Sequence, residues 1–208
     1  LSRKLAKELN YKVLEEPVGE NPYLEKFYQD PQRYALEMQF WLMSRRFAMH
    51  RQAVEHIWNN GQGVIMDRSI YGDAIFAKKN FFDGNIDSVG YQNYLEMRDV
   101  MLRYLMVPHV TIYLDASVDN CLERIMQRSR TCESQIPASY LQGLHSLYQE
   151  LLVELARKGS KVVNLDWSTF RTTEFVIDEL RKEGVSLESY KDYIPINESL
   201  KSDFKSLN

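Results

Sequence analysis

The sequence predicts an α/β fold in which helices cover both faces of a parallel sheet. Four short runs are apolar throughout rather than at alternate positions, which is typical of strands covered on both faces. These runs alternate with longer segments whose apolar residues recur at helical spacing. The chain has 208 residues, of which 44% are hydrophobic, and this is enough for one core. We therefore expect a single domain of three layers.

The expected elements follow one another from the first residue. Apolar residues at 1, 5 and 9 predict an amphipathic helix over 1–9. A strand is predicted at 11–14, because Pro17 disfavours helix at Glu16. A long helix is predicted over 31–59, which lacks glycine and proline after its start and stops near Gly61. The further expected elements are a strand at 63–67, helices at 69–82 and 88–106, a strand at 110–115, helices at 118–127 and 138–158, and a strand at 161–165. The polar residues 187–208 are expected to form a C-terminal appendage.

Composition excludes several classes of function. The formal net charge is −3, so the surface lacks the basic field that binding of a nucleic acid polymer usually requires. No apolar run approaches the roughly 20 residues that cross a bilayer, so a membrane role is not expected. The two cysteines, Cys121 and Cys132, fit neither a disulfide framework nor a zinc site. We expect a reducing compartment, either the cytoplasm or the mitochondrion.

Acidic residues follow three of the predicted strands: Glu16, Asp67 and Asp115. In open parallel sheets, ligands bind beyond the carboxyl ends of the strands. Any one of these acids, taken alone, could be a helix N-cap or a solvated loop residue. Together they predict a polar site at one edge of the sheet.

Several blocks of sequence make the chain similar to a known family. They are EPV at 16–18, NPYLEKFY at 21–28, Met38-Gln39 with Arg46, DRSIYGD at 67–73, and RIMQRSR at 124–130 with Glu133. In this order and spacing, over about residues 1–150, they resemble the deoxyribonucleoside kinases, in particular those acting on deoxyguanosine, deoxyadenosine or deoxycytidine. The resemblance implies a P-loop kinase-like fold with a five-stranded parallel sheet, ATP and Mg²⁺ as cofactors, and a homodimer. It also implies phosphorylation of the 5′-hydroxyl of a deoxynucleoside in nucleotide salvage, and we expect a purine substrate, deoxyguanosine or deoxyadenosine.

The resemblance assigns catalytic roles to two residues. A 5′-hydroxyl is a poor nucleophile until a base takes its proton, and Glu16 at a strand end is expected to be that base. Arg68 is expected to hold Glu16 or the transferring phosphate by a charge-assisted pair. The alternative for Arg68 is a structural ion pair with Asp67 or Asp73. Asp67 itself is expected to contact Mg²⁺, directly or through water.

A second group of residues is expected to bind the nucleoside. Gln39 and Arg46 are seven residues apart, so they lie on nearly one face of the long helix. Similar kinases use this glutamine, and this arginine paired with Asp73, to recognise the base. The alternative is that both are only the polar face of an amphipathic helix.

Other substrate contacts are expected around the base and the sugar. Leu24, Met38 and Phe76 are expected to form apolar walls beside the base, although such residues are more often plain core. Tyr28 and Glu133 resemble the pair that binds the sugar 3′-hydroxyl. Met38 and Asn21 stand where many relatives carry aromatic residues, so the sequence departs here from the family's pattern for stacking on the base.

Three arginines predict a lid over the phosphate donor. Arg124 and Arg128 are four residues apart on one helix face, and Arg130 follows. Like charges at this spacing repel unless an anion joins them, and a triphosphate would be that anion. The alternative is a solvated basic end of a helix.

The printed sequence contains no G-x-x-x-x-G-K-[ST] string, the loop whose amides cradle phosphates. In the family this loop follows a central first strand and precedes a helix resembling residues 1–9. We therefore expect the natural protein to carry roughly 15 to 20 further residues before Leu1. The domain described by the printed sequence would then lack its first strand and its phosphate-binding loop.

Two other functions remain open at this point. A respiratory complex I accessory subunit resembles the same family and shares the pattern of residues 24–31 and 61–64, so a non-catalytic role in a larger complex is the alternative. A nucleoside monophosphate kinase has similar architecture, but it would need basic residues at the acceptor phosphate. Glu16 stands there instead, which favours an uncharged hydroxyl acceptor.

Overall fold

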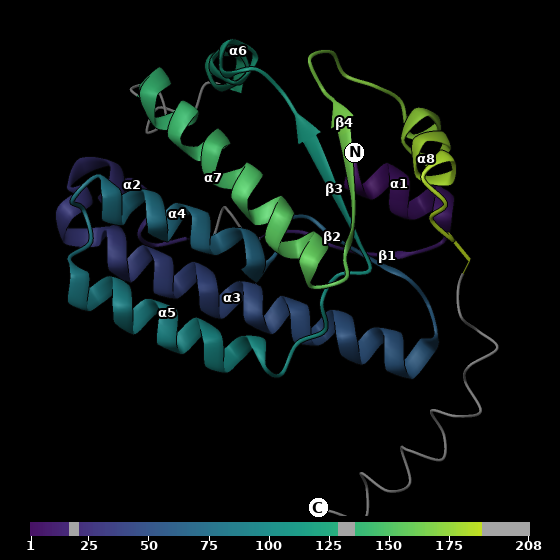
Figure 1. The fold of residues 1–208 in the computed structure, drawn as a ribbon, viewed down its shortest axis with the longest axis horizontal. Coiled ribbons are helices and arrows are strands. Elements are labelled where there is room, and N and C mark those ends of the chain that lie inside the picture. The colour runs from purple at the N-terminus through teal and green to yellow at the C-terminus, as the bar shows by residue number, and fades with distance from the viewer. Residues whose placement is uncertain (17–20, 129–135, 189–208) are drawn as a thin grey trace, which may run out of the picture.

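The computed structural model describes residues 1–16, 21–128 and 136–188. The order of the elements alternates helices with short strands (Figure 1). The elements are α1 (Ser2–Leu9), β1 (Lys12–Leu14), α2 (Leu24–Gln29), α3 (Pro31–Asn60), β2 (Val64–Met66), α4 (Ile70–Phe82), α5 (Ser88–Leu102), β3 (Val110–Asp115), α6 (Val118–Arg128), α7 (Ala138–Arg157), β4 (Lys161–Asp166) and α8 (Thr173–Lys182).

Each predicted strand and helix is present, with small differences at the ends. Helix α5 stops at Leu102, four residues before its expected end. Two helices were not predicted. Helix α2 is only six residues long, too short for a periodic pattern. Helix α8 follows Thr172, a residue type that commonly caps helices, and the Thr172 side chain accepts a hydrogen bond from the Phe175 amide.

The strands form two parallel pairs rather than one continuous sheet within the described residues. Lys12 to Leu14 of β1 pair with Val64 to Met66 of β2, and Val110 to Asp115 of β3 pair with Lys161 to Asp166 of β4. All residues of β2 and β3 are only half-buried, whereas β4 buries Val163 and Leu165. β2 and β3 are not hydrogen-bonded to each other among the described residues, and the expected sheet is one whose central strand is missing from the printed sequence.

Helices cover both faces of the β3–β4 pair, as Figure 1 shows. On one side Val162 packs against the apolar cluster of α4 and α7. On the other side Val163 and Leu165 pack with Leu5 of α1 and Val176 of α8. Successive side chains of a strand point to opposite faces, so this alternation produces the predicted three-layer α/β arrangement.

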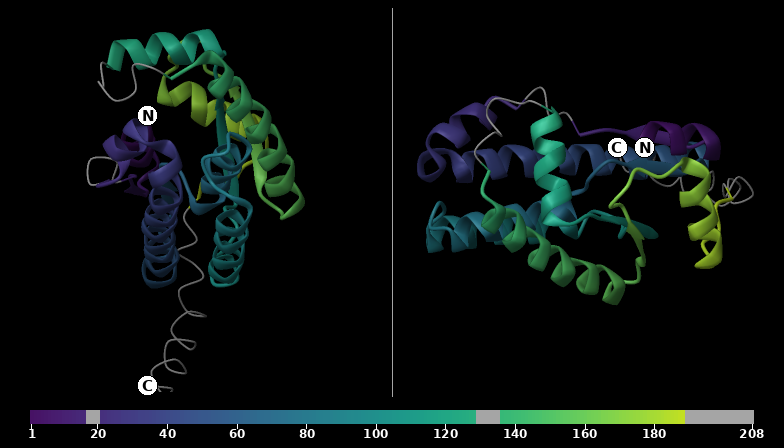
Figure 2. Two further views of the ribbon diagram at one scale, coloured as in Figure 1. Left: turned by 90° about the vertical axis from the view of Figure 1, so that its left-hand side faces the viewer. Right: turned by 90° about the horizontal axis from the view of Figure 1, so that it is seen from above.

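A group of packed helices carries the larger core. Helices α3, α4 and α5 contact one another, and α7 packs on α4. Helix α6 contacts α7 and lies beyond the carboxyl ends of β3 and β4 (Figure 2). The long helix α3 begins at Pro31, with the Asp30 side chain accepting a hydrogen bond from the Arg33 amide, and ends at Asn60, after which Gly61 caps it with φ 60°. Among the described residues, no helix is long and apolar enough to span a bilayer.

The packing of α1 predicts a measurable contribution to stability. Leu5 is 2% exposed against β4 and α8, whereas Leu1 of the same segment is 42% exposed. Leu5→Ala should lower the free energy of unfolding by about 2–5 kcal/mol, because it removes buried methyl groups and leaves a cavity. Urea denaturation measures this, with Leu1→Ala as the control. Equal stability of the two variants would show that α1 is not part of the core.

Candidate active site

A single cavity of about 1650 Å³ brings most of the predicted site residues together. It runs past the carboxyl ends of the strands, where ligands bind in open parallel sheets. Glu16 and Arg128, far apart in the chain, both line it. The other predicted residues that line it are Leu24, Tyr28, Met38, Gln39, Arg46, Asp67, Arg68, Phe76 and Arg124.

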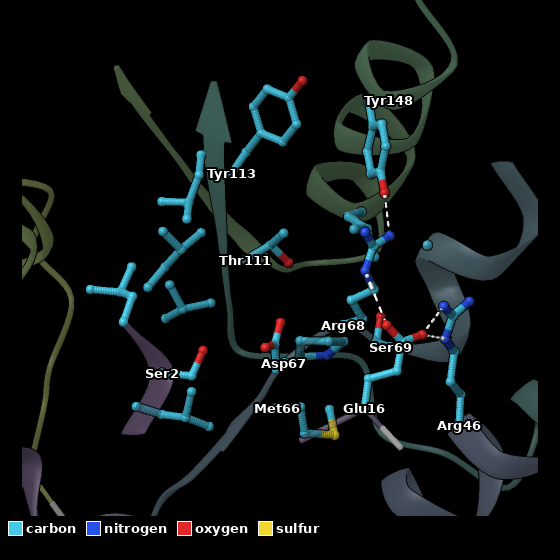
Figure 3. Close-up of a pocket in the computed structure, with 18 of the residues that line it drawn as sticks. Ser2, Glu16, Arg46, Met66, Asp67, Arg68, Ser69, Thr111, Tyr113 and Tyr148 are labelled. Atoms are coloured by element: carbon cyan, nitrogen blue, oxygen red, sulfur yellow. Dashed lines mark hydrogen bonds and ion pairs between the residues drawn. The ribbon is translucent and has the colours of Figure 1, made fainter. Parts of the chain in front are cut away.

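The Glu16 carboxylate lies between two guanidinium groups, as Figure 3 shows. Its Oε1 accepts hydrogen bonds from Arg46 Nε, at 3.0 Å, and from Arg46 Nη2. Its Oε2 lies 3.3 Å from Arg68 Nε. Charge-assisted pairs of this kind are roughly twice as strong as neutral hydrogen bonds. The carboxylate is therefore fixed at the end of β1 with both oxygens oriented.

Arg46 is shared by two carboxylates. Besides Glu16 it binds Asp73 through Nη1, and the second Asp73 oxygen accepts a hydrogen bond from the Tyr94 hydroxyl at 2.8 Å. Burial raises the pKa of the Asp73 carboxyl above its ordinary value, although Arg46 and Tyr94 oppose that shift. Burial and the neighbouring Asp73 also raise the pKa of Tyr94, so this hydroxyl stays a donor. The expected pairing of Arg46 with Asp73 is present; its part in base recognition stays a prediction.

Gln39 presents an amide that the protein itself does not satisfy. Its side chain is 0% exposed, and neither Nε2 nor Oε1 has a hydrogen-bond partner among the described residues. Buried polar groups are nearly always paired, and leaving one unpaired costs about 1–3 kcal/mol. Because Gln39 lines the cavity, its amide is available to a ligand there.

Arg68 is held by residues from three parts of the chain. Besides Glu16, its Nη1 donates to the Tyr148 hydroxyl at 3.2 Å, and its guanidinium lies 5.3 Å from the centre of the Phe76 ring. The backbone at Arg68 has φ 68°, which is uncommon for a residue with a side chain. The alternative partners Asp67 and Asp73 form no ion pair with Arg68. The expected pairing with Glu16 is present, and the catalytic role stays a prediction.

The apolar walls come from α2, α3 and α4. Leu24, Tyr28 and Met38 belong to one apolar cluster beside the cavity, and Phe76 packs edge-on against Tyr148. These residues therefore serve both as core and as cavity wall. Glu133 lies outside the described residues, so its expected pairing with Tyr28 stays a prediction.

The lid arginines differ from one another in their surroundings. Arg124 donates from Nη2 to the carbonyl oxygens of Trp167, at 2.6 Å, and Ser168, at 3.1 Å, and its guanidinium lies 4.5 Å from the centre of the Phe170 ring. It is thus engaged by the loop after β4, which the sequence did not indicate. Arg128 lines the cavity, and Arg130 lies outside the described residues. Contact of these arginines with a triphosphate stays a prediction.

Asp67 is the carboxylate expected to meet Mg²⁺. It is exposed at the end of β2 and lines the cavity. Among the described residues no group of three or more histidine, cysteine or acidic side chains could hold a metal. Mg²⁺ usually binds through one or two carboxylates, several waters and the phosphates of a substrate. A single exposed carboxylate fits that mode.

Comparisons with known proteins identify the family. The model for the deoxynucleoside kinase family matches residues 1–191 of the chain. The chain belongs to the deoxynucleoside kinase family. A deoxyguanosine kinase from Dictyostelium discoideum is 42% identical over 184 residues, which cover 88% of this chain and 65% of the relative. The chain thus spans about two thirds of the length of that kinase.

Solved kinase structures support the fold. A deoxyadenosine kinase from M. mycoides with bound dCTP superposes with a TM-score of 0.75 and 27% identity, over 87% of this chain and 91% of that one. The predicted P-loop kinase-like α/β fold is confirmed. A subunit of another kind is also similar: NADH dehydrogenase [ubiquinone] 1 alpha subcomplex subunit 10 of Bos taurus is 30% identical, over 77% of this chain and 48% of the subunit.

The hydrogen bond from Tyr94 to Asp73 predicts a stability change that depends on pH. Tyr94→Phe should lower the free energy of unfolding by about 1–3 kcal/mol at neutral pH, because the ionised carboxylate loses a donor in a buried site. This donor favours the ionised form, so the loss should shrink as the pH falls through the raised pKa of Asp73. Denaturation at neutral and acid pH measures this. Tyr104→Phe, at a residue 74% exposed, should have no effect at either pH.

Proposed function

We propose that the protein transfers the γ-phosphate of ATP to the 5′-hydroxyl of a deoxynucleoside. The observation that carries this proposal is the Glu16 carboxylate, held between Arg46 and Arg68, in the same cavity as the unsatisfied amide of Gln39. The Glu16 carboxylate can accept a proton, and the Gln39 amide can recognise a ligand.

Glu16 acts as the general base in this proposal. It takes the proton of the 5′-hydroxyl while the oxygen attacks the γ-phosphorus and the bond from that phosphorus to ADP breaks, so the proton ends on a carboxylate oxygen and ADP leaves. Arg46 keeps the carboxylate oriented from α3, and Arg68 stabilises negative charge on the transferring group. A carboxylate at this point would repel an acceptor that already carries a phosphate, so an uncharged alcohol is the better acceptor.

The base lies against Gln39 in this proposal. A carboxamide has one acceptor and two donors, so it can pair with a base edge through two hydrogen bonds. Arg46 also lines the cavity and adds a further polar group, and the fully buried Asp73 pairs with Arg46. Kinases of deoxyguanosine and deoxyadenosine are among the relatives, which supports a purine substrate.

ATP and Mg²⁺ are expected on the other side of Glu16, where Asp67 and Arg128 line the cavity. Mg²⁺, when bound with the nucleotide, neutralises phosphate charge. Asp67 would hold the ion and Arg128 would contact the phosphates. A role in nucleotide salvage, a homodimer, and a place in the cytoplasm or mitochondrion belong to the same proposal.

We also propose that an extended segment with a phosphate-binding loop pairs between β2 and β3. Both strands are half-buried along their length and line the same cavity. Ile65 of β2 and Ile112 of β3 pack against one apolar cluster, so a strand placed there would find apolar neighbours. Such a strand would supply the backbone partners that buried strand edges require.

The second candidate is a non-catalytic subunit of a larger complex. The similarity to the Bos taurus NADH dehydrogenase subunit favours it. Glu16, Arg46, Arg68 and Asp73 nevertheless form a connected network of charges, which a purely structural subunit has no need to keep. Incubating the full-length protein with ATP, Mg²⁺ and each of the four deoxynucleosides distinguishes the two. Formation of a deoxynucleoside monophosphate supports the kinase, and its absence supports the subunit.

The general-base role predicts an effect on turnover. Glu16→Gln should lower kcat by about 10²- to 10⁴-fold, because the amide cannot take a proton, and should leave nucleoside affinity nearly unchanged. Glu15→Gln is a matched control, since the neighbouring Glu15 pairs with Arg3 at the surface. Steady-state kinetics and equilibrium binding of the nucleoside measure both quantities. Equal turnover of Glu16→Gln and the wild type would refute the assignment.

The unsatisfied amide of Gln39 predicts opposite effects on stability and binding. Gln39→Leu should raise the free energy of unfolding of the ligand-free protein by about 1–3 kcal/mol, because a buried unpaired amide disappears. The same change should weaken nucleoside binding and alter the ranking of the four bases. Gln52→Leu, on the exposed face of the same helix, is the control. An unchanged base ranking would show that Gln39 does not read the base.

A further inference from the structure

Arg68 joins the site carboxylate to a tyrosine on a distant helix (Figure 3). Its Nε lies 3.3 Å from Glu16 Oε2, and its Nη1 donates to the Tyr148 hydroxyl at 3.2 Å. Tyr148 lies on α7, 80 residues further along the chain. Because α7 packs on α4, the helix that follows Arg68, this contact couples the outer helix to the site.

The backbone at Arg68 is constrained. Only Arg68 and Asn10 combine a side chain with positive φ among the described residues, and Asn10 caps the end of α1, where this conformation is common. Arg68 instead follows β2, and the preceding amide, of Asp67, donates to the Leu14 carbonyl at 2.8 Å. Such conformations persist where the surroundings over-determine them. The constrained backbone thus fixes the position from which the Arg68 side chain extends.

The side chain itself needs further contacts to be ordered. It is 45% exposed, and a long exposed side chain loses much rotamer entropy when it is held in one geometry. Two aromatic rings restrict the orientation of the guanidinium plane. The guanidinium lies 5.3 Å from the centre of the Phe76 ring, and the Tyr148 ring packs edge-on against Phe76 with 6.4 Å between ring centres. The Tyr148 hydroxyl then fixes rotation within that plane.

We propose that Tyr148 is a positioning residue that orients Arg68 toward the transferring phosphoryl group. With Nε directed at Glu16 and Nη1 at Tyr148, Nη2 makes no hydrogen bond to any other described residue and can donate to a phosphoryl oxygen. A neutral hydroxyl suits this task, because it orients the guanidinium without competing for its charge. The inference rests on the proposed function and adds a residue outside the predicted site.

Binding of the preferred deoxynucleoside and of its 5′-monophosphate tests the proposal without requiring turnover. Tyr148→Phe should weaken binding of the monophosphate about five- to tenfold, the effect of one ordinary hydrogen bond, and leave nucleoside binding unchanged. Isothermal titration calorimetry of the full chain measures both. Tyr113→Phe is the matched control: its ring lies 5.7 Å from that of Tyr148, yet no hydrogen bond of its hydroxyl occurs in the described part of the chain.

A double-mutant cycle separates positioning from a general structural role. In an Arg68→Ala background, Tyr148→Phe should cause no further loss of monophosphate affinity. Arg68→Lys keeps the positive charge but loses the planar guanidinium, so it should lose about as much monophosphate affinity as Tyr148→Phe. If Tyr148→Phe does not fold, Arg68→Lys replaces it in the test.

Each outcome decides the matter. Wild-type protein that binds neither ligand would overturn the proposed function and this inference together. Wild-type protein that binds both, with Tyr148→Phe indistinguishable from Tyr113→Phe, would overturn this inference alone. A Tyr148→Phe loss of equal size in the Arg68→Ala background would show that Tyr148 does not act through Arg68.

Discussion

The site depends on one buried arginine that binds two carboxylates. Arg46 on α3 contacts Glu16, after β1, and Asp73, on α4, and only 4% of its side chain is exposed. Removing one partner of a buried pair leaves an uncompensated charge, which is far costlier than the pair is stabilising. Three elements that are distant in sequence are therefore held in one arrangement by the requirement that this charge be neutralised.

The same arrangement separates two kinds of polar group. Glu16, Arg46 and Asp73 are already paired with one another by hydrogen bonds, so their geometry is formed without a ligand. The amide of Gln39 has no such partner in the described structure. Preorganised charges suit chemistry on a ligand, because they need no reorientation as the reaction proceeds, whereas an unsatisfied amide suits recognition, because a bound ligand removes its cost.

Sequence could predict the parts of this structure that depend on local pattern. Uniformly apolar runs marked the four strands, and the resemblance to a family predicted the contacts of Arg46 with Asp73 and of Arg68 with Glu16. Tyr94 and Tyr148 were missed, because each meets its partner from a different helix, 21 and 80 residues away, and an aromatic residue at helical spacing gives no sign of a polar contact. The apolar runs alone did not show which strands pair, because apolar character indicates that a strand is buried but not which strand lies beside it.

The half-buried strands connect the fold to the chemistry. Residues 163–166 of β4 alternate between buried and exposed. Every residue of β3 is intermediate in exposure, and Val110 to Leu114 border the cavity that contains Glu16. A segment paired between β2 and β3 would bury those residues and end beside Asp67, at the carboxyl edge of the sheet. Backbone amides at that point would face the same space as Arg128. The proposed segment would then complete both the sheet and an anion site, because the apolar contacts that hold its strand also determine where its last backbone amides lie.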